Sequence, residues 1–129
     1  MFMVDTYTPT RVVFGPGRLE ELATVALPGK KALVCVTQDG LMEKLGIQGR
    51  VLDLLKKNGV EAVVYDGICP NPTRKSVMEA TAIAKENGCD FFLGLGGGSS
   101  IDTAKAAAVM MRNPGDLWDY AYAGSGGKK

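Results

Sequence analysis

The chain has 129 residues, the usual size of one domain, and its apolar content of 46% is enough to build a core. Fifteen lysines and arginines stand against 14 acidic residues, so no broad basic field is available for nucleic acid or an anionic membrane surface. The absence of histidine excludes Ser-His-Asp and Cys-His catalysis and every histidine-containing metal site within these residues.

Cysteine usage and the first residues bear on the cellular setting. The three cysteines, at positions 35, 69 and 89, are odd in number and form no CxxC pair, which argues against a disulfide scaffold or a zinc knuckle. Residues 1–10 carry an acid and no basic residue, so neither a signal peptide nor a membrane-spanning helix is predicted. We expect a soluble protein in the reducing cytoplasm.

The pattern of apolar and turn-forming residues predicts that the chain begins with a strand, a turn and a helix. Residues 11–14 (RVVF) predict a short strand that ends at the turn Gly15-Pro16-Gly17. Residues 18–26 carry leucine and alanine at helical spacing and predict a short helix. Residues 31–37 (KALVCVT) are almost entirely apolar, as a parallel strand buried on both faces requires.

A second helix and a third strand follow. Residues 41–58 predict a helix in one or two pieces, with Gly46 and Gly49 as its break and Asn58-Gly59 as a left-handed stop. Residues 60–68 (VEAVVYDGI) then predict the third strand. This strand must end before residue 70, because the prolines that follow lack the N–H groups that a ladder needs.

The second half of the chain repeats this order. Thr73 is the expected N-cap of a helix over residues 75–86, which Asn87-Gly88 stops. Residues 90–95 (DFFLGL) predict a fourth strand, and residues 100–111 predict a helix rich in alanine and methionine. Strands that alternate with helices at this spacing predict a single α/β domain, a Rossmann-like parallel sheet with flanking helices and right-handed crossovers.

The loop between the fourth strand and the last helix predicts a phosphate site. It consists of Gly96, Gly97, Gly98 and Ser99, and it places unhindered backbone N–H groups at the positive end of a helix dipole. A Cβ would keep a diphosphate off this backbone, and Ser99 can cap the helix or donate its hydroxyl to a phosphate oxygen. Asp102 is expected in the first helical turn, first as a cap or loop brace and second as a cofactor or substrate contact.

The glycine loop departs from two common phosphate motifs. No Lys-Ser or Lys-Thr follows the glycines directly, so the loop is not a P-loop. It follows the fourth predicted strand, whereas the dinucleotide fingerprint follows the first strand of a Rossmann domain. A purely structural turn between a strand and a closely packed helix therefore stays open as an alternative.

Two further loops follow predicted strands and should face the same edge as the glycine loop. After the second strand, Gln38 and Asp39 precede Gly40, and an acid there can accept both ribose hydroxyls of a nucleotide. After the third strand, Asn71 lies between two prolines and can offer its amide to adenosine or diphosphate. The structural alternatives are a turn-forming acid at Asp39 and a bracketed loop amide at Asn71.

These motifs together resemble the group III, iron-containing alcohol dehydrogenases, which are also similar to glycerol dehydrogenase and more distantly to dehydroquinate synthase. The resemblance covers nearly the whole chain, and the combination is highly specific. It rests on the segments Phe14-Gly15-Pro16-Gly17, Tyr65-Asp66-Gly67, Pro70-Asn71-Pro72-Thr73 and Gly96-Gly97-Gly98-Ser99-Ser100-Ile101-Asp102-Thr103-Ala104-Lys105.

The resemblance implies a two-domain enzyme that uses NAD or NADP. An α/β domain would bind the dinucleotide, and a helical domain would hold iron or zinc with one Asp and three His residues and polarise the oxygen of an alcohol or aldehyde. None of these ligands is expected within residues 1–129, which we interpret as one truncated nucleotide-binding domain that is inactive alone. Family members pair through their amino-terminal strands, so a homodimer or a higher oligomer is expected.

The choice of cofactor depends on the loop after the second strand. The family's common Thr-Asp pair aligns most simply with Thr37 and Gln38, which leaves Asp39 one place late. An Asp39 that reaches the ribose would repel a 2′-phosphate and favour NAD, whereas Gln38 in that place would accept either cofactor. A nucleotide- or phosphate-binding α/β module without catalysis remains the alternative function, and a structural remnant with an open sheet edge is the third.

Overall fold

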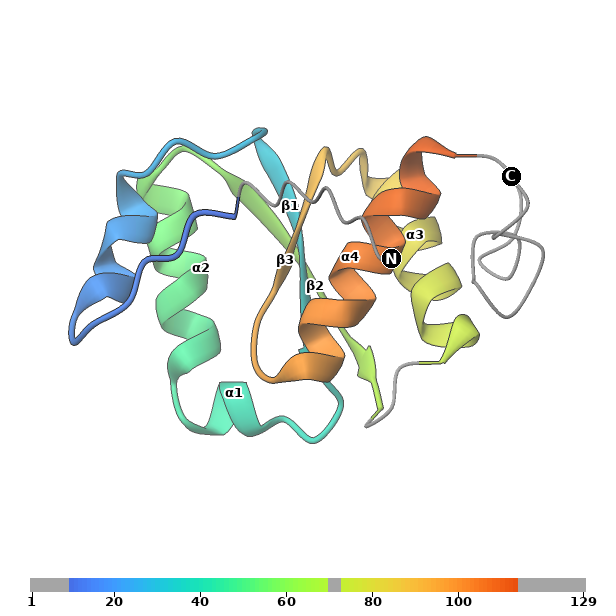
Figure 1. The fold of residues 1–129 in the computed structure, drawn as a ribbon, viewed down its shortest axis with the longest axis horizontal. Helices are drawn as coiled ribbons and strands as arrows, with labels where there is room; N and C mark the ends of the chain where they lie inside the picture. The colour runs from blue at the N-terminus through green and yellow to red at the C-terminus, as the bar shows by residue number, and fades with distance from the viewer. Residues whose placement is uncertain (1–9, 70–72, 114–129) are drawn as a thin grey trace, which may run out of the picture.

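The computed structural model describes residues 10–69 and 73–113. In this part of the chain, three parallel strands form one sheet in the order β2-β1-β3, with β1 (Lys31–Thr37) at the centre. β2 (Glu61–Ile68) and β3 (Phe91–Gly94) lie on either side of it (Figure 1). Lys31 is opposite Glu61 on one side of β1, and Ala32 is opposite Phe91 on the other.

Helices cover both faces of the sheet (Figure 1). α2 packs on one face, and α3 and α4 pack together on the other. The chain passes from β1 to β2 through α1 and α2, and from β2 to β3 through α3. The helices in chain order are the 3₁₀-helix η1 (Arg18–Ala23), α1 (Leu41–Lys44), α2 (Ile47–Lys57), α3 (Arg74–Asn87) and α4 (Gly98–Arg112).

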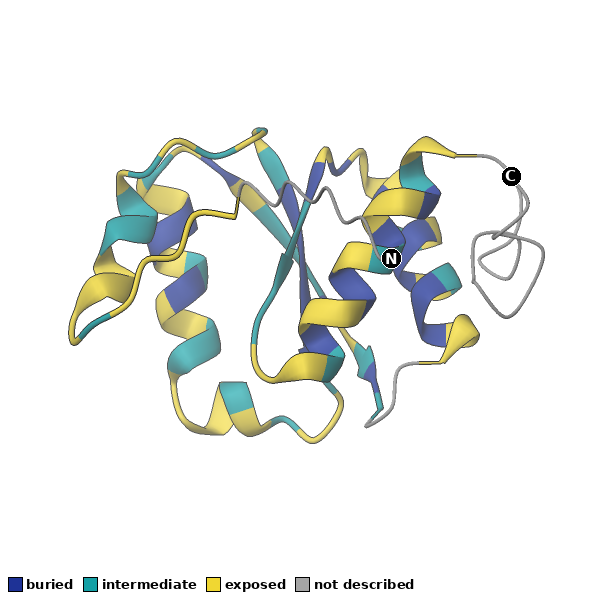
Figure 2. Ribbon diagram, viewed as in Figure 1, coloured by how far each residue is buried: buried dark blue, intermediate teal, exposed yellow. Residues whose placement is uncertain are grey.

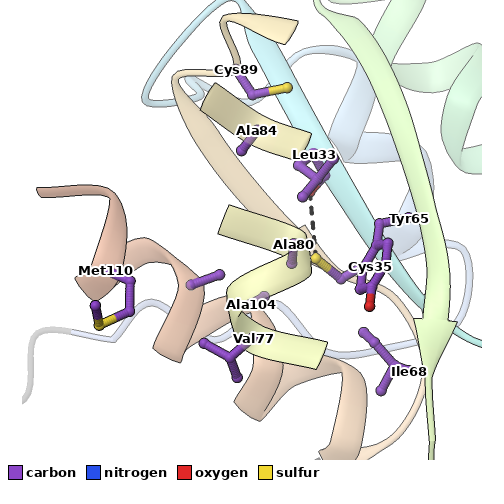
Figure 3. Close-up of a cluster of buried hydrophobic side chains, with 11 residues drawn as sticks. Leu33, Cys35, Tyr65, Ile68, Val77, Ala80, Ala84, Cys89, Ala104 and Met110 are labelled. Atoms are coloured by element: carbon purple, nitrogen blue, oxygen red, sulfur yellow. Dashed lines mark hydrogen bonds between the residues drawn. The ribbon is translucent and has the colours of Figure 1, made fainter. Parts of the chain in front are cut away.

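The central strand supplies both halves of the core. Alternate side chains of a strand point to opposite faces, so Leu33 and Cys35 pack against α3 and α4 (Figure 3), while Val34 and Val36 belong to the cluster on the α2 face. Residues 32–36 are all buried, and the burial extends from β1 into both helical layers (Figure 2). The nearly unbroken apolar run that predicted this strand is explained by its central position.

Glycine and threonine mark the helix ends where the sequence predicted them. Gly46 adopts a left-handed conformation, with a φ of 74°, and separates α1 from α2, whereas Gly49 lies within α2 and makes no break. The Thr73 side chain accepts a hydrogen bond from the Ser76 N–H at 3.2 Å and caps α3. Gly88, with a φ of 67°, ends that helix. The predicted α/β class, the parallel sheet and the flanking helices are confirmed.

The strand predicted over residues 11–14 is wrong. These residues form no strand and pair with none of the described strands, and Val12 and Phe14 are 79% and 90% exposed. An apolar run becomes a strand only when a neighbouring strand satisfies its backbone, and this segment lies along neither edge strand of the described sheet. The helix predicted over residues 18–26 is also shorter, because η1 ends at Ala23.

The three cysteines are free, in agreement with the sequence. Burial raises the pKa of the Cys35 thiol to about 12, so this thiol stays protonated and packs as an apolar side chain. Across residues 10–69 and 73–113, no helix is both long enough and apolar enough to cross a membrane.

Candidate functional site

The described parallel strands end at one edge of the sheet, as parallel strands must. β1 ends at Thr37, β2 at Ile68 and β3 at Gly94, and the loops after them leave from the same side (Figure 1). Ligands of open α/β sheets bind outside the carboxyl ends of the strands. The candidate site is therefore this edge.

The loop after β1 is held against the end of β2. The Gln38 N–H donates to the Ile68 carbonyl oxygen at 2.9 Å, and this bond extends the pairing of the two strands by one residue. A cavity of about 490 Å³ opens at this place, lined by Thr37, Gln38, Asp39 and Ile68. Gln38 and Asp39, the two expected ribose contacts, thus share one concave surface.

Asp39 organises its own loop. Its Oδ1 accepts a hydrogen bond from the Thr37 hydroxyl at 2.8 Å and another from the Leu41 N–H at 3.1 Å. The Leu41 N–H and then the Thr37 hydroxyl lower the pKa of the Asp39 carboxyl below its ordinary value, so the group is charged at neutral pH. The hydrogen bonds of Oδ1 therefore stabilise a turn, which is the structural role that the sequence left open for Asp39. Oδ2 receives no hydrogen bond from any described residue.

The glycine loop connects β3 to α4 by a short path. The Leu95 N–H donates to the Cys35 carbonyl at 2.9 Å, and the chain then turns at Gly96, which has a φ of 127°. Gly97 is the N-cap of α4, and the bond from the Ile101 N–H to the Gly97 carbonyl spans 3.3 Å. The N–H groups at the start of α4, before Ile101, have no acceptor within the helix and carry the positive end of its dipole.

The glycines differ in what surrounds them. A Cβ on Gly94 would lie 2.8 Å from the Ile101 Cα and 2.9 Å from the Ser100 carbonyl oxygen, so this glycine allows α4 to approach β3. A Cβ on Gly97 or Gly98 would meet no atom within 4 Å. The space in front of these two residues is therefore open, as a phosphate-binding backbone requires.

The glycine loop and the loop after β1 lie side by side. A Cβ on Gly96 would come 3.9 Å from the Cγ of Met42, which belongs to α1. The strand order β2-β1-β3 explains this contact, because the chain leaves β1 toward one face of the sheet and leaves β3 toward the other. Doubly wound sheets bind their ligands in the crevice between two loops that separate in this way.

Two expectations about the start of the last helix are wrong. α4 begins at Gly98, two residues earlier than predicted, so Ser99 lies in the first turn and the N-cap is Gly97, which has no side chain. Asp102 was expected in the first turn, where it would brace the loop. It is instead the fifth residue of α4, lies beyond the first turn and is exposed. Glycine is poor within a helix but acceptable at its first positions, where backbone N–H groups need no intrahelical acceptor.

The remaining expected residue, Asn71, lies outside the described residues. The structure also adds Gly94, Met42 and Ser100 to the site, and the sequence alone predicted no role for these three residues. The pattern Gly94-Leu95-Gly96 could have indicated a close approach of strand and helix. Its first glycine still belongs to the strand and is not needed for the turn, so it suggests a place where another backbone comes near. Met42 carries no comparable sequence signal.

A larger cavity, of about 600 Å³, follows the outer edge of β3. Phe92, Ile101 and Met111 are among its lining residues. Within the described sheet, β3 has no neighbour on this side, so the cavity reflects an unpaired edge rather than the crevice at the carboxyl ends. No group of three histidine, cysteine or acidic side chains suited to a metal ion occurs in the described part of the chain.

This arrangement places the chain among the doubly wound parallel α/β proteins. The sequence model of the family described as iron-containing alcohol dehydrogenase matches residues 9–129. The chain belongs to this family.

Similar proteins carry consistent names. The chain is 36% identical to the probable NADH-dependent butanol dehydrogenase 1 of Bacillus subtilis, over 88% of this chain and 29% of that protein. It is 34% identical to the 1,3-propanediol dehydrogenase of Klebsiella pneumoniae, over 92% of this chain and 31% of that protein. The structure of the aldehyde reductase YqhD from E. coli covers 97% of this chain with a TM-score of 0.82 and 32% identity, and the chain covers 32% of it. The chain thus spans about 30% of the length of these relatives.

Proposed function

We propose that this chain binds the dinucleotide NAD(H) at the crevice between the loops after β1 and β3. The observation that carries the proposal is the glycine loop at the start of α4, which lies against α1 at the point where the strand order reverses. Free backbone N–H groups, an open space without a Cβ and the helix dipole are the features that bind a diphosphate. Relatives named as NADH-dependent support the choice of ligand.

The neighbouring loops support an inference about where the rest of the dinucleotide lies. We infer that the diphosphate lies on Gly97, Gly98 and Ser99, and that the adenosine ribose lies toward the cavity at Gln38 and Asp39. The charged Asp39 favours the ribose hydroxyls of NAD and repels the 2′-phosphate of NADP. We propose Asn71 and Asp102 as secondary contacts, since Asn71 follows β2 in the sequence and Asp102 is one helical turn from the loop.

The activity proposed for the family protein as a whole is hydride transfer between the nicotinamide and an alcohol or aldehyde. The nicotinamide, when bound, supplies the hydride acceptor or donor. Iron or zinc does not fit the residues of this chain, because the sequence has no histidine and its described part has no group of three metal ligands. We therefore assign this chain cofactor binding without turnover, which is also the behaviour of a nucleotide-binding module.

The test separates binding from folding. A Cβ at position 98 has no neighbour within 4 Å, so Gly98→Ala should fold as well as the parent chain, or better, because alanine is the stronger helix former. The added methyl group stands where the diphosphate must approach the backbone. Calorimetric titration with NADH should show binding to the parent chain and a loss of at least about tenfold in Gly98→Ala, the cost of about 1.4 kcal/mol.

The matched control is Gly49→Ala in α2, where a Cβ also has no neighbour within 4 Å. It should raise stability as Gly98→Ala does and leave NADH affinity unchanged. Equal NADH affinity in the parent chain and Gly98→Ala would show that the diphosphate does not bind at this loop. A titration of the parent chain with millimolar NADH that gives no heat would reject the proposed function itself.

We also infer that the chain self-associates through its amino-terminal segment. Phe14 is 90% exposed and borders a largely apolar cavity of about 620 Å³ whose lining includes Val13, Leu19 and Leu22. Exposed apolar surface of this kind favours an interface. Light scattering after size exclusion should give at least a dimer, Phe14→Ser should shift it toward monomer, and Leu45→Ser, at a 60% exposed leucine elsewhere, should not.

A further inference from the structure

Ser100 is a buried hydroxyl whose role is not explained by folding. It is the third residue of α4, its side chain is 0% exposed, and its Oγ has no hydrogen-bond partner in the described structure. Burying a hydroxyl without a partner is unfavourable, since it gives up hydrogen bonds to water and gains none. A serine in such a place is explained by a state of the molecule in which the hydroxyl is paired.

The position of this hydroxyl connects it to the glycine loop. A Cβ on Gly96 would lie 3.4 Å from the Ser100 Oγ, so the hydroxyl faces the inner side of the loop at the start of α4. The backbone of Ser100 packs closely on Gly94 of β3, since a Cβ built on Gly94 would lie only 2.9 Å from the Ser100 carbonyl oxygen. The hydroxyl therefore lies beside Gly96, the residue directly before the segment that we assign to the diphosphate.

Thr103 is a second buried hydroxyl without a hydrogen-bond partner in the described structure, and it lies away from the loop. Its hydroxyl is also 0% exposed and without a partner in the described structure, and it lies three residues further along the same helix. No atom of Thr103 is among those nearest to a Cβ built at Gly94, Gly96, Gly97 or Gly98. The two residues therefore share burial and chemistry and differ in their distance from the loop.

The loop can move toward Ser100. Gly96 has a φ of 127°, and both it and Gly97 can change backbone conformation at little cost because they have no side chain. Anion binding at the start of a helix draws these residues onto the ligand through their N–H groups. A rotation at Gly96 would move its backbone groups relative to the Ser100 hydroxyl, which borders this residue.

We propose that Ser100 is a positioning residue for the diphosphate, and that its hydroxyl bonds to the backbone of Gly96 when the loop closes on the dinucleotide. This inference rests on the proposed binding of NADH. The bond is absent from the free chain and present in the complex, so it contributes to affinity and nothing to the stability of the free chain. Ser100 acts on the ligand through the loop and does not touch it.

Ser100→Ala tests the proposal because it gives effects of opposite sign. Removing an unpaired buried hydroxyl should leave the urea midpoint of the free chain unchanged or raise it. The same change should weaken NADH binding about fivefold, the equivalent of one ordinary hydrogen bond. Thr103→Val, of nearly the same shape as threonine, should match it in stability and keep the parent affinity for NADH.

Each result decides the matter. A lower urea midpoint in Ser100→Ala would overturn the inference, because it would mean that the hydroxyl is already bonded in the free chain. Unchanged NADH affinity in Ser100→Ala, or an equal loss in Thr103→Val, would overturn it while the proposed function stands. A parent chain that does not bind NADH would reject the function and this inference with it. Opposite effects confined to Ser100 support it.

Discussion

Gly94 at the end of β3 and Ile101, the fourth residue of α4, approach each other so closely that a Cβ on Gly94 would lie 2.8 Å from the Ile101 Cα. The obstructing atoms belong to the helix backbone, which cannot move away as a flexible side chain could. This contact fixes the distance between the strand and the helix. It also sets where the start of α4, and with it the glycine loop, lies relative to the sheet edge.

Gly94→Ala is therefore expected to destabilise the chain by about 1–3 kcal/mol, the usual cost of forcing an extra carbon into a packed interior. The helix must shift away from β3, which also displaces the loop. Urea unfolding, followed by far-ultraviolet circular dichroism, measures the free energy, and NADH titration measures the displacement of the loop.

Gly49→Ala is the control for this substitution. It lies within α2, and a Cβ there would meet no atom within 4 Å. Replacing a helical glycine by alanine without a clash should stabilise the chain by roughly 0.5–1 kcal/mol. If Gly94→Ala and Gly49→Ala were stabilised alike, Gly94 could not lie as close to the backbone of α4 as the structure places it.

The sequence predicted the elements whose cause is local or whose burial is complete. The strand over residues 31–37 was correct because a central strand between two helical layers must be apolar on both faces. The break at Gly46 and the cap at Thr73 were correct because a left-handed turn and an N-cap depend on a few neighbouring residues. Such features need no knowledge of distant parts of the chain.

Features set by distant contacts were missed. Residues 11–14 have the composition of a strand, but only a neighbouring strand could have made them one. The role of Gly94 depends on the distance between β3 and α4, and the burial of Ser100 depends on how α4 sits on the sheet. The expectation for Asp102 failed for a different reason, because three successive glycines obscured the true start of the helix.

Asp39→Asn should change the choice of cofactor without disturbing the loop. The amide oxygen of asparagine can still accept the hydrogen bonds from Thr37 and Leu41 that the carboxylate accepts. The negative charge that opposes a 2′-phosphate is lost. We expect the ratio of NADPH to NADH affinity to rise on the order of tenfold, as for the loss of one charge close to a phosphate near water.

Gln38→Ala is the companion variant, since both side chains line the same cavity. It should weaken NADH and NADPH alike if Asp39 is the ribose contact. The reverse pattern, with an unchanged ratio in Asp39→Asn and a changed one in Gln38→Ala, would assign the ribose to Gln38. Competition titrations at low ionic strength give both ratios with one preparation.

Thr73→Ala should weaken the start of α3. The Thr73 Oγ1 accepts the Ser76 N–H at 3.2 Å, and alanine leaves that N–H without a side-chain acceptor. The expected loss is about 1 kcal/mol, typical of a threonine N-cap. Thr24→Ala removes an exposed threonine whose hydroxyl donates to the Glu21 carbonyl, and it should change the unfolding free energy by less than about 0.5 kcal/mol. Equal losses would mean that Thr73 is no cap.

Asp90 joins the start of β3 to the start of β1, and this contact predicts a loss of stability in acid. Its carboxylate accepts the Lys30 N–H at 2.9 Å through Oδ2 and the Lys31 N–H at 2.9 Å through Oδ1. The Lys30 N–H and then the Lys31 N–H lower the pKa of Asp90 below its ordinary value of 3.8. The folded chain thus holds this proton less tightly than the unfolded chain does.

Stability must therefore rise with pH wherever the unfolded state binds more protons. The contribution of Asp90 is complete above its ordinary pKa and disappears as the pH falls through the lower pKa of the folded state. Urea midpoints measured from about pH 6 down to about pH 2.5 should decline in the parent chain below about pH 4. Asp90→Asn should have a lower midpoint at about pH 6 and a shallower decline.

Asp53→Asn is the matched control, because Asp53 is an exposed carboxylate of α2 that accepts no hydrogen bond from the described residues. It removes one negative charge, as Asp90→Asn does, but leaves the N–H groups of Lys30 and Lys31 paired. Its acid profile should follow that of the parent chain. A profile of Asp53→Asn as shallow as that of Asp90→Asn would show that net charge, and not the bridge between β3 and β1, governs the acid response.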